Sequence, residues 1–242
     1  MEGLQLKVPF TDDEYASILV PSKKVIQSKS IWYAQKATLG ILRHDLTKDL
    51  LKTEHGMPIV KAYTGDLPAM LVDFNSALKC GNPNAWLHGF SDDVILDRGW
   101  HNPQLIFSRI PINGGLVSLD FSMRLDMAEA ELIYNTFRRN AFAQMGQNCG
   151  YKVIAAISWA NALSLEYAFD GIEPGGIYAI SNIGTMRHPI SRKIFKMGVV
   201  ELVRRLNPRC LIIYGYELDF DCGVKTVVFQ NPNLLRLHNL RK

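Results

Sequence analysis

Asp120 is the residue of this sequence best placed to do chemistry. It follows directly after the apolar run Leu116–Leu119, and Ser122 and Arg124 follow at alternating positions. A carboxylate at the end of a buried strand has a pKa set by its burial, so it can act as a general base or as a metal ligand. The structural alternative is that Asp120 caps the next segment or pairs with Arg124 or Arg138. The residue types leave both roles open.

A second acidic group, Glu217, Asp219 and Asp221, follows a later apolar run, with Lys225 beyond it. Alternating acids on an extended segment project to one side, where they can hold a divalent cation for nuclease-type chemistry. The spacing matches no compact metal motif, and a solvated hairpin explains the same residues. We therefore name Glu217 with Asp120 as candidate catalytic residues, predict no dedicated metal site, and leave a divalent cation compatible with the sequence.

Polar and aromatic residues also follow the other predicted strands, for example Ser158 and Trp159 after the run KVIAAI. In parallel α/β folds the loops after the strands converge on one face, and ligands bind there. We therefore expect these residues to share one ligand-binding rim. The predicted ligand-binding set is Asp92, Asp93, Ser122, Arg124, Trp159, Ser181, Asn182, Gly184 and Tyr216.

Each of these residues also has a structural interpretation. N-capping of the following helix explains Asp92 and Asp93. Trp159 can stack on a base or sugar, or it can cover the core of the sheet. Asn182 ahead of Gly184 can offer an amide and a bare backbone to a ligand, or it can form a turn.

Basic residues gather on the last long predicted helix, which begins at Ile190. Arg192 and Lys196 are four residues apart and share one helix face, with Lys193 beside them. The N-terminus of such a helix can bind an anion such as phosphate, whereas a solvated outer face explains the same lysines and arginines. The predicted anion or nucleic-acid contacts are Arg187, Arg192, Lys193 and Lys196.

The elements that must position these side chains alternate between apolar runs and helical patterns. KVIAAISW is a nearly continuous apolar run of the type buried on both faces in parallel sheets, and Gly150 ends the helical stripe before it. Predicted strands are MPIVKAY, AMLVDF, AWLHGF, Leu116–Phe121, KVIAAISW, IYAIS, CLIIYGY and TVVFQ. Predicted helices are VILDRGW, PQLIFSRI, Met127–Cys149, Leu163–Phe169 and Ile190–Leu206.

Strands separated by helices need crossover connections, which give a parallel sheet. From AWLHGF onward the pattern contains about six strands. The predicted fold class is α/β, with a mostly parallel sheet and helical crossovers. The arrangement is either barrel-like, as a complete or truncated β/α barrel, or an open three-layer sandwich.

Length and composition fit one α/β domain with an extension. The chain has 242 residues, 48% of them hydrophobic and 21% charged, and a formal net charge of +4. This charge permits contact with nucleic acid without arguing for it. Residues 1–56 show no steady hydrophobic period, so we predict an N-terminal extension that packs on the core or binds a partner. Residues 57–242 form the single α/β domain.

Several function classes are excluded by missing motifs. The chain has no GxxxxGK[ST] loop, no GxGxxG fingerprint and no cysteine–histidine array, so no P-loop, dinucleotide or zinc site is predicted. The N-terminus lacks the basic start and apolar core of a signal peptide, and no apolar run reaches the roughly 20 residues of a membrane helix. We expect a cytoplasmic protein with reduced cysteines and no membrane partner, in the host cytoplasm if phage-encoded.

The same motifs resemble domain-of-unknown-function family 4417 over about residues 86–216. The segments that carry the resemblance are FSDDVILDRGWHNP, SLDFSMRLDMAEAELIYNTFRRN, VIAAISWANALSLEYAFDGIEPGGIYAISNIG and FKMGVVELVRRLNPRCLIIYG. Relatives commonly have proline where this chain has Leu119, and many carry a histidine-containing turn in place of Ser181-Asn182-Ile183-Gly184. The resemblance implies a phage or mobile-element setting and carries no activity with it.

Two functions are compatible with these observations. The first is binding or processing of a nucleotide or nucleic acid at the carboxyl-end rim of the strands. The alternative is a non-catalytic interaction protein that binds and modulates a host protein through its aromatic, lysine-rich N-terminal segment. Whether the protein is an enzyme is left open by the sequence.

Overall fold

The computed structural model describes residues 43–186 and 188–231. The chain divides into two units between Lys48 and Asp49. Of the first unit the described part holds the short helix α4, His44–Thr47, beside which Arg43 and Asp45 form an ion pair of 2.9 Å. The predicted boundary between residues 56 and 57 stays a prediction, and most of the predicted extension lies outside the described residues.

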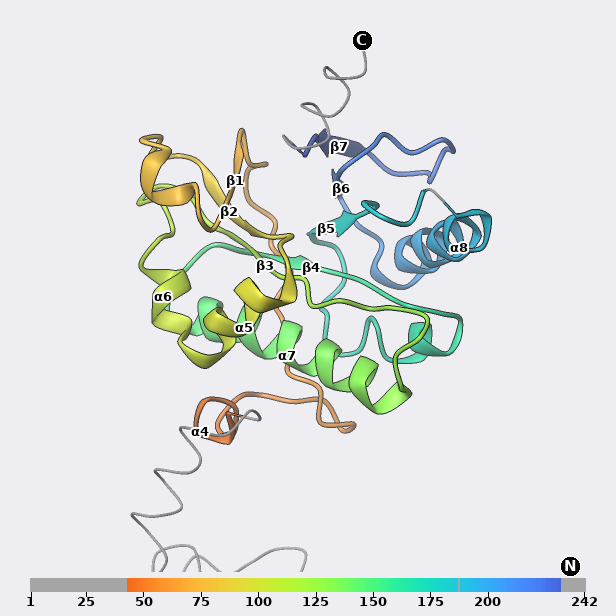
Figure 1. The fold of residues 1–242 in the computed structure, drawn as a ribbon, viewed down its shortest axis with the longest axis horizontal. Coiled ribbons are helices and arrows are strands. Elements are labelled where there is room, and N and C mark those ends of the chain that lie inside the picture. The colour runs from red at the N-terminus through yellow and green to blue at the C-terminus, as the bar shows by residue number, and fades with distance from the viewer. Residues whose placement is uncertain (1–42, 187, 232–242) are drawn as a thin grey trace, which may run out of the picture. The chain divides into compact units, whose positions relative to one another are not determined.

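The second unit is built on a sheet of seven strands that are all parallel and follow one another in chain order (Figure 1). The strands are β1 Leu71–Asp73, β2 Trp86–Gly89, β3 Leu116–Leu119, β4 Val153–Ala156, β5 Ile177–Ser181, β6 Cys210–Tyr214 and β7 Thr226–Phe229. The sheet curls into a half-barrel with helices in the crossovers. The predicted α/β class is therefore confirmed in its truncated-barrel form.

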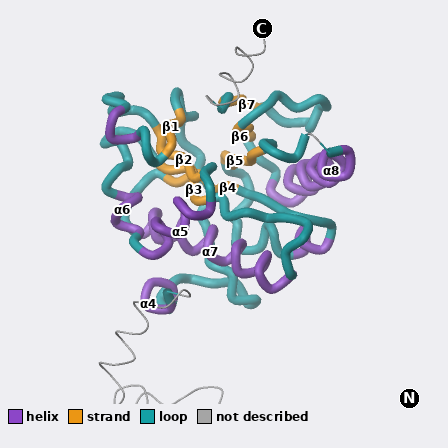
Figure 2. The backbone as a smooth tube through the Cα atoms, viewed as in Figure 1, coloured by secondary structure: helices purple, strands orange, loops and turns teal. Residues whose placement is uncertain are grey.

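The helices are α5 Asp93–His101, α6 Pro103–Phe107, α7 Glu129–Asn148 and α8 Pro189–Leu206, with 3-10 turns η1 Ala77–Lys79 and η2 Leu163–Glu166. They lie outside the curved row of strands (Figure 2). Gly150 ends α7 with φ 83°, as a C-cap glycine does. The predicted helices are all present, although the segment predicted as Leu163–Phe169 is a 3-10 turn.

Two layers of side chains line the concave face of the sheet. Alternate residues of a strand point to the same face, so the apolar layer continues from strand to strand across paired positions. Trp86, Val117, Ala156, Ala179 and Ile212 belong to this layer, and each is at most 5% exposed. This apolar layer forms the floor of the half-barrel. The next side chain along each strand that points to the same face lies above this floor.

A β-bulge decides what stands above the floor on β3. The register between β2 and β3 shifts at Gly89, which pairs with Leu119, whereas His88 pairs with Val117. A Cβ at Gly89 would collide with the backbone of Ser118 and Leu119, so only glycine permits this approach. The extra residue turns Leu119 toward α5 and leaves Asp120 on the concave side.

Helix α7 packs on β3 and β4 and carries an unusual number of buried polar side chains. Asn140 donates to the carbonyl of Asp170 at 2.8 Å, and Gln144 both accepts from the N–H and donates to the carbonyl of Leu51 at 2.9 Å. These bonds tie irregular segments to the helix. On the outer side of α7, Ile133 is 38% exposed.

Two further predictions were wrong. The segment MPIVKAY is not a strand, because within it only Pro58 and Val60 form single bridges, to Lys52 and Ile172. The segment between β6 and β7 is not a hairpin, because these two strands are parallel and the chain must cross over. No helix in the described part of the chain is both long and apolar enough to cross a membrane.

Candidate functional site

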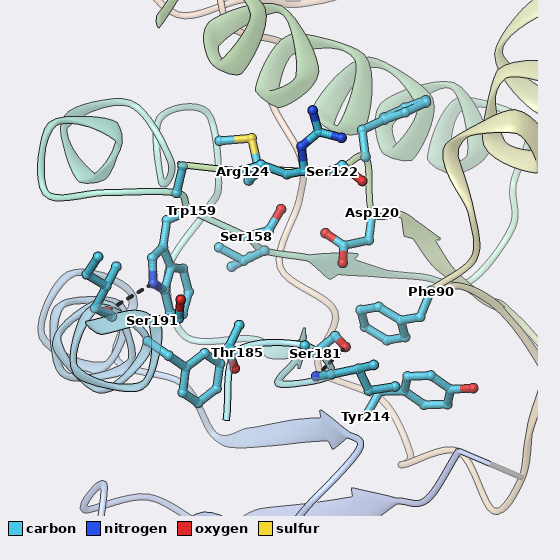
Figure 3. A pocket seen from close by; sticks show the side chains of 18 of the residues that line it. Phe90, Asp120, Ser122, Arg124, Ser158, Trp159, Ser181, Thr185, Ser191 and Tyr214 are labelled. Atoms are coloured by element: carbon cyan, nitrogen blue, oxygen red, sulfur yellow. Dashed lines mark hydrogen bonds between the residues drawn. The ribbon is translucent and has the colours of Figure 1, made fainter. Parts of the chain in front are cut away.

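A pocket of about 590 Å³ opens at the carboxyl ends of β2, β3, β4 and β5 (Figure 3). Its lining comes from the loops after these strands, from Tyr214 of β6 and from the first turns of α8. The pocket is thus made by chain segments that lie far apart in sequence, which is what the predicted rim requires. Prominent lining residues are Phe90, Asp120, Ser122, Ser158, Ser181 and Tyr214.

Polar side chains occupy the layer directly above the apolar floor. Ser158 comes two residues after Ala156, and Ser181 two residues after Ala179, so both point to the same side as the floor residues. Asp120 reaches this layer by way of the bulge. The strand period therefore places a carboxylate and two hydroxyls around one hollow.

Asp120 is the most perturbed group of the pocket. Burial raises the pKa of its carboxyl from 3.8 to about 6, and the negative charge of Asp93 adds to the rise. A hydrogen bond with Ser158 and the positive charge of Arg139 oppose it. Among the described residues, Asp120 Oδ1 is buried and has no hydrogen-bond partner. A buried oxygen with a free lone pair costs free energy unless a ligand fills the position.

Arg139 lies beneath the pocket and is 1% exposed. Its guanidinium donates to the carbonyls of Ala168 at 2.7 Å and of Ser158 at 3.3 Å. Burial lowers the pKa of Arg139 to about 10, and the charge of Asp120 opposes that shift. The arginine therefore stays charged at neutral pH and acts on Asp120 through its charge, without an ion pair between the two in the described part of the chain.

Two aromatic rings form one wall of the pocket. Phe90 and Tyr214 stack with ring centroids 4.9 Å apart and planes 10° apart. His88 packs against Tyr214 at 4.6 Å on the same side of the sheet. In Figure 3 the Phe90 ring points toward Asp120 across the hollow. A flat apolar surface therefore faces the carboxylate.

Trp159 forms the opposite wall together with α8. Its indole N–H donates to the carbonyl of Ile194 at 3.3 Å, and its ring lies parallel to Phe195 with centroids 5.7 Å apart. A Cβ at Gly198 would collide with the indole, so the glycine lets helix and tryptophan approach. Trp159 is only 9% exposed, so it supports the wall.

The structure brings most of the predicted ligand-binding residues to this pocket. Those that line it are Asp92, Ser122, Arg124, Trp159, Ser181 and Gly184. Asp92 is the residue before α5 but makes no side-chain capping bond. Asp93 instead accepts the N–H of Ser122 at 3.0 Å, so it fixes the loop that carries Ser122. Asp92 therefore occupies the predicted N-cap position without a side-chain capping bond, and N-capping was the wrong explanation for Asp93.

The predicted pairing of Asp120 with Arg124 or Arg138, one part of its structural alternative, was wrong. Arg124 pairs with Asp126 at 3.0 Å, and Arg138 pairs with Asp97 at 2.6 Å. Neither arginine is paired with Asp120. The arginine that influences Asp120 is Arg139, which sequence reasoning missed.

Asn182 and Tyr216 lie outside the pocket lining. Asn182 is fully buried, and its amide donates to the carbonyl of Tyr216 at 2.7 Å and accepts the N–H of Tyr216 at 2.8 Å. It therefore joins the loops after β5 and β6. Tyr216 is 45% exposed.

Glu217 is not brought to Asp120. It lines a separate hollow with Phe220 and Asp221. Nearby, Arg192 of α8 forms an ion pair with Asp219, and Lys196 lies 4.7 Å from the Phe220 ring centroid. The charges of Arg192 on the helix and Asp219 on the loop thus compensate each other. Lys193 lies on α8 outside the pocket lining, and Arg187 falls outside the described residues.

No group of three or more metal-ligating side chains gathers anywhere in residues 43–186 and 188–231. The four cysteines are free thiols, and Cys210 is buried in the core as predicted. Sequence reasoning missed the aromatic wall, Phe90 and Tyr214, and the α8 residue Ser191. For Tyr214 the sequence did contain a signal, because Tyr214 lies two residues after Ile212 and therefore on the same face of β6.

Two phage proteins are similar to this chain. The Gene 1 protein of Mycobacterium phage L5 is 28% identical over 195 residues, which cover 78% of this chain and 83% of the relative. The Gene 1 protein of Mycobacterium phage D29 is 32% identical over 129 residues, which cover 53% of this chain and 48% of that protein. No solved structure matches the chain significantly.

The segments that carried the resemblance hold the strands and helices around the pocket, and both relatives come from phages, as the resemblance implied. The sequence profile of the family described as "Domain of unknown function (DUF4417)" matches residues 51–231, and the chain belongs to this family.

Proposed function

We propose that the protein binds and processes a nucleotide or nucleic acid in the 590 Å³ pocket, with Asp120 as its general acid and base. The observation that carries this proposal is the buried, unpartnered Oδ1 of Asp120 at the floor of an accessible pocket, within the part of the chain that the structure describes. An unfilled acceptor that the fold holds at a cost is typical of a site that a ligand completes.

The two walls of the pocket support a ligand with a flat part and a polar part. The stacked rings of Phe90 and Tyr214 offer an apolar face, on which bases and sugars pack well. On the other side Ser181, Thr185 and Ser191 bring hydroxyls close to the start of α8, where backbone N–H groups favour anions. The volume lies in the range of small-molecule sites, about 300–1,000 Å³.

The pKa of Asp120 suits proton transfer near neutral pH. At about 6 it is high enough for a carboxylate to be a useful base and low enough for it to be mostly deprotonated at pH 7. The Ser158 hydroxyl lies beside Asp120 and lowers the pKa of its carboxyl, against the effect of burial. Removal of a proton from a ligand hydroxyl or from a bound water is the chemistry that this arrangement favours.

The test is to incubate the protein with nucleoside mono-, di- and triphosphates and with short single-stranded oligonucleotides, measuring binding by calorimetry and conversion by chromatography. Asp120→Asn keeps the shape but cannot transfer a proton, so we expect binding to persist while conversion falls by about 10²–10⁴-fold. Asp126→Asn is the matched control, because Asp126 is exposed and lies outside the pocket lining. The proposal fails if the folded wild type binds none of these ligands.

The alternative, a protein that modulates a host factor, depends on residues 1–42, which lie outside the described part of the chain. It stays a prediction, as do the cytoplasmic location and any divalent cation.

A further inference from the structure

A second hollow of about 330 Å³ lies beside the proposed site, between β1 and β7 at the open side of the half-barrel. It shares Tyr214 with the first pocket. Its lining combines apolar and polar side chains, among them Val72, Asp73, Lys79, His88, Tyr214 and Phe229.

His88 is the group that the rest of the protein leaves unexplained. It is 4% exposed, and its Nδ1 accepts the N–H of Phe90 at 3.2 Å. This bond requires an unprotonated Nδ1, so in the neutral ring the proton sits on Nε2. Among the described residues, Nε2 makes no hydrogen bond, and His88 lines the hollow. A buried imidazole therefore presents one N–H donor with nothing in the fold to receive it.

Burial lowers the pKa of His88 to about 4, and the carboxylate of Asp73 opposes that shift. The ring is therefore neutral at physiological pH. Its unused group acts as a donor of a hydrogen bond, and it adds no positive charge to the hollow.

Asp73 is the acceptor beside this donor. It is paired with His88 across β1 and β2, so the two side chains share the concave face. Ser76 donates its hydroxyl to Asp73 Oδ2 at 2.6 Å, and the N–H of Asn75 donates to Oδ1 at 2.9 Å. These bonds fix the carboxylate and hold its pKa below the usual value, against the effect of burial. The N–H of Ser76 also donates to Oδ1, at 3.1 Å. Asp73 is thus ionised, and of its roughly four acceptor positions one, on Oδ2, is left for a ligand.

The hollow matches a neutral planar ligand with an acceptor and a donor on one edge. Lys79 also lines the hollow, so its lining carries one acidic and one basic side chain. The Tyr214 ring gives a flat surface, and Phe229 adds an apolar one. Nucleobases have this shape and this edge, and carboxylates accept hydrogen bonds from their amino and ring N–H groups.

We propose that this second hollow is a nucleobase subsite, in which His88 Nε2–H donates to the base and Asp73 accepts from it. The inference rests on the proposed function, because both hollows would hold one ligand. The base of that ligand extends past Tyr214 into the second hollow, while the sugar or phosphate lies near Asp120. Recognition is by hydrogen bonds and stacking, and no metal takes part.

The direct test follows the imidazole signals of the six histidines in a ¹H–¹⁵N spectrum of the full chain, with the His88 signal assigned from a His88→Asn variant. Adenosine, guanosine, cytidine, uridine and ribose are added separately at pH 7. We expect the His88 signal to show a protonated Nε2 before addition and to move when a nucleoside binds. Ribose alone should leave it unchanged.

The variant test compares Asp73→Asn with Asp66→Asn, an exposed aspartate that lines neither hollow. Replacing the acceptor by an amide should weaken nucleoside binding by about ten-fold or more, because the base then faces an N–H donor. The control should bind as wild type. Thermal unfolding of both variants shows whether a loss of binding comes from loss of fold.

The outcomes separate the two proposals. Nucleotides that bind and respond to Asp120→Asn, but neither move the His88 signal nor respond to Asp73→Asn, would overturn the base subsite alone. Nucleosides and nucleotides that all fail to bind would overturn both. A His88 signal that shows a protonated Nδ1 would overturn the donor assignment even if ligands bind, and because this measurement uses wild type, misfolding of a variant cannot obscure it.

Discussion

Buried polar groups are treated in two different ways in this molecule. On α7, Arg139, Asn140 and Gln144 each donate to backbone carbonyls of neighbouring segments, whereas Arg138 Nε is an exception without a partner among the described residues. At the carboxyl ends of the strands, Asp120 Oδ1 is buried without a partner in the described part of the chain, and His88 Nε2 makes no hydrogen bond there and borders a hollow. Buried polar groups with a partner stabilise the fold, whereas buried polar groups without one lower the free energy of unfolding.

The contrast separates scaffold from site without reference to sequence similarity. A buried group that fills its hydrogen bonds within the chain needs no ligand to explain it. One that is held buried and unfilled at the edge of a pocket does. Each of the following measurements tests one side of that distinction.

Replacing Arg139 by methionine should have the largest effect. The variant keeps much of the volume but leaves the carbonyls of Ser158 and Ala168 buried without donors. We expect the free energy of unfolding to fall by about 3–5 kcal/mol, measured by urea denaturation. A loss below about 1 kcal/mol would show that this buried arginine is not structural. Gln147→Ala is a useful comparison, since Gln147 makes its backbone bonds at the surface.

Replacing Asp120 by asparagine should do the opposite and stabilise the protein at pH 8. The pKa of Asp120 is about 6 in the folded state and 3.8 ordinarily, so ionisation of this carboxyl destabilises the folded state above pH 6. A shift of this size corresponds to about 3 kcal/mol at most. The gain should shrink as the pH falls and vanish below about pH 4. Equal effects at pH 4.5 and pH 8 would contradict it.

The contribution of His88 to the free energy of unfolding should change with pH in the opposite direction to that of Asp120, over nearly the same pH range. Its folded pKa of about 4 lies below 6.5, so the unfolded chain binds the proton first and stability is lost as the pH falls from about 6.5 toward 4. In wild type the rising contribution of Asp120 opposes this loss. In the Asp120→Asn background we expect a fall of about 2 kcal/mol between pH 6.5 and 4.5. A flat profile there would mean that the pKa of His88 is the same in the folded and the unfolded state.

The smallest effect should come from the neutralised surface outside the pocket. Asp219→Ala removes the partner of Arg192, but both side chains are at least 41% exposed. Exposed ion pairs contribute about 0–1 kcal/mol, so the unfolding free energy should hardly change. Ligand binding should not change either. A large loss of binding would bring the acidic loop, and with it Glu217, back into the site.

The fold was largely predictable because its signal is local. Apolar runs such as Leu116–Leu119, which is followed by polar residues and a helix, specify parallel strands and the edge where their ends meet. Asp120, Trp159 and Ser181 could be placed at the pocket on that basis. The curvature that makes a half-barrel was only one of the arrangements that the pattern allowed.

The pairings inside the site were not predictable in the same way. Arg139 has a charged side chain on a helix, which a pattern assigns to solvent, and its burial depends on carbonyls about 20 to 30 residues later in the chain. Glu217 was misplaced because the end of a strand fixes the edge but not how far a long loop travels from it. His88 was recognised as a core or rim residue, but its unused nitrogen is visible only in three dimensions.

Gly89 has a consequence for attempts to transplant the proposed chemistry. Because a single additional residue on the neighbouring strand sets which side chain faces inward, the acid's orientation is a property of the backbone irregularity and the glycine that tolerates it. An aspartate grafted onto a regular strand of a similar sheet would follow the ordinary alternation and could end up facing the helices. A designer would have to copy the kink before copying the carboxylate.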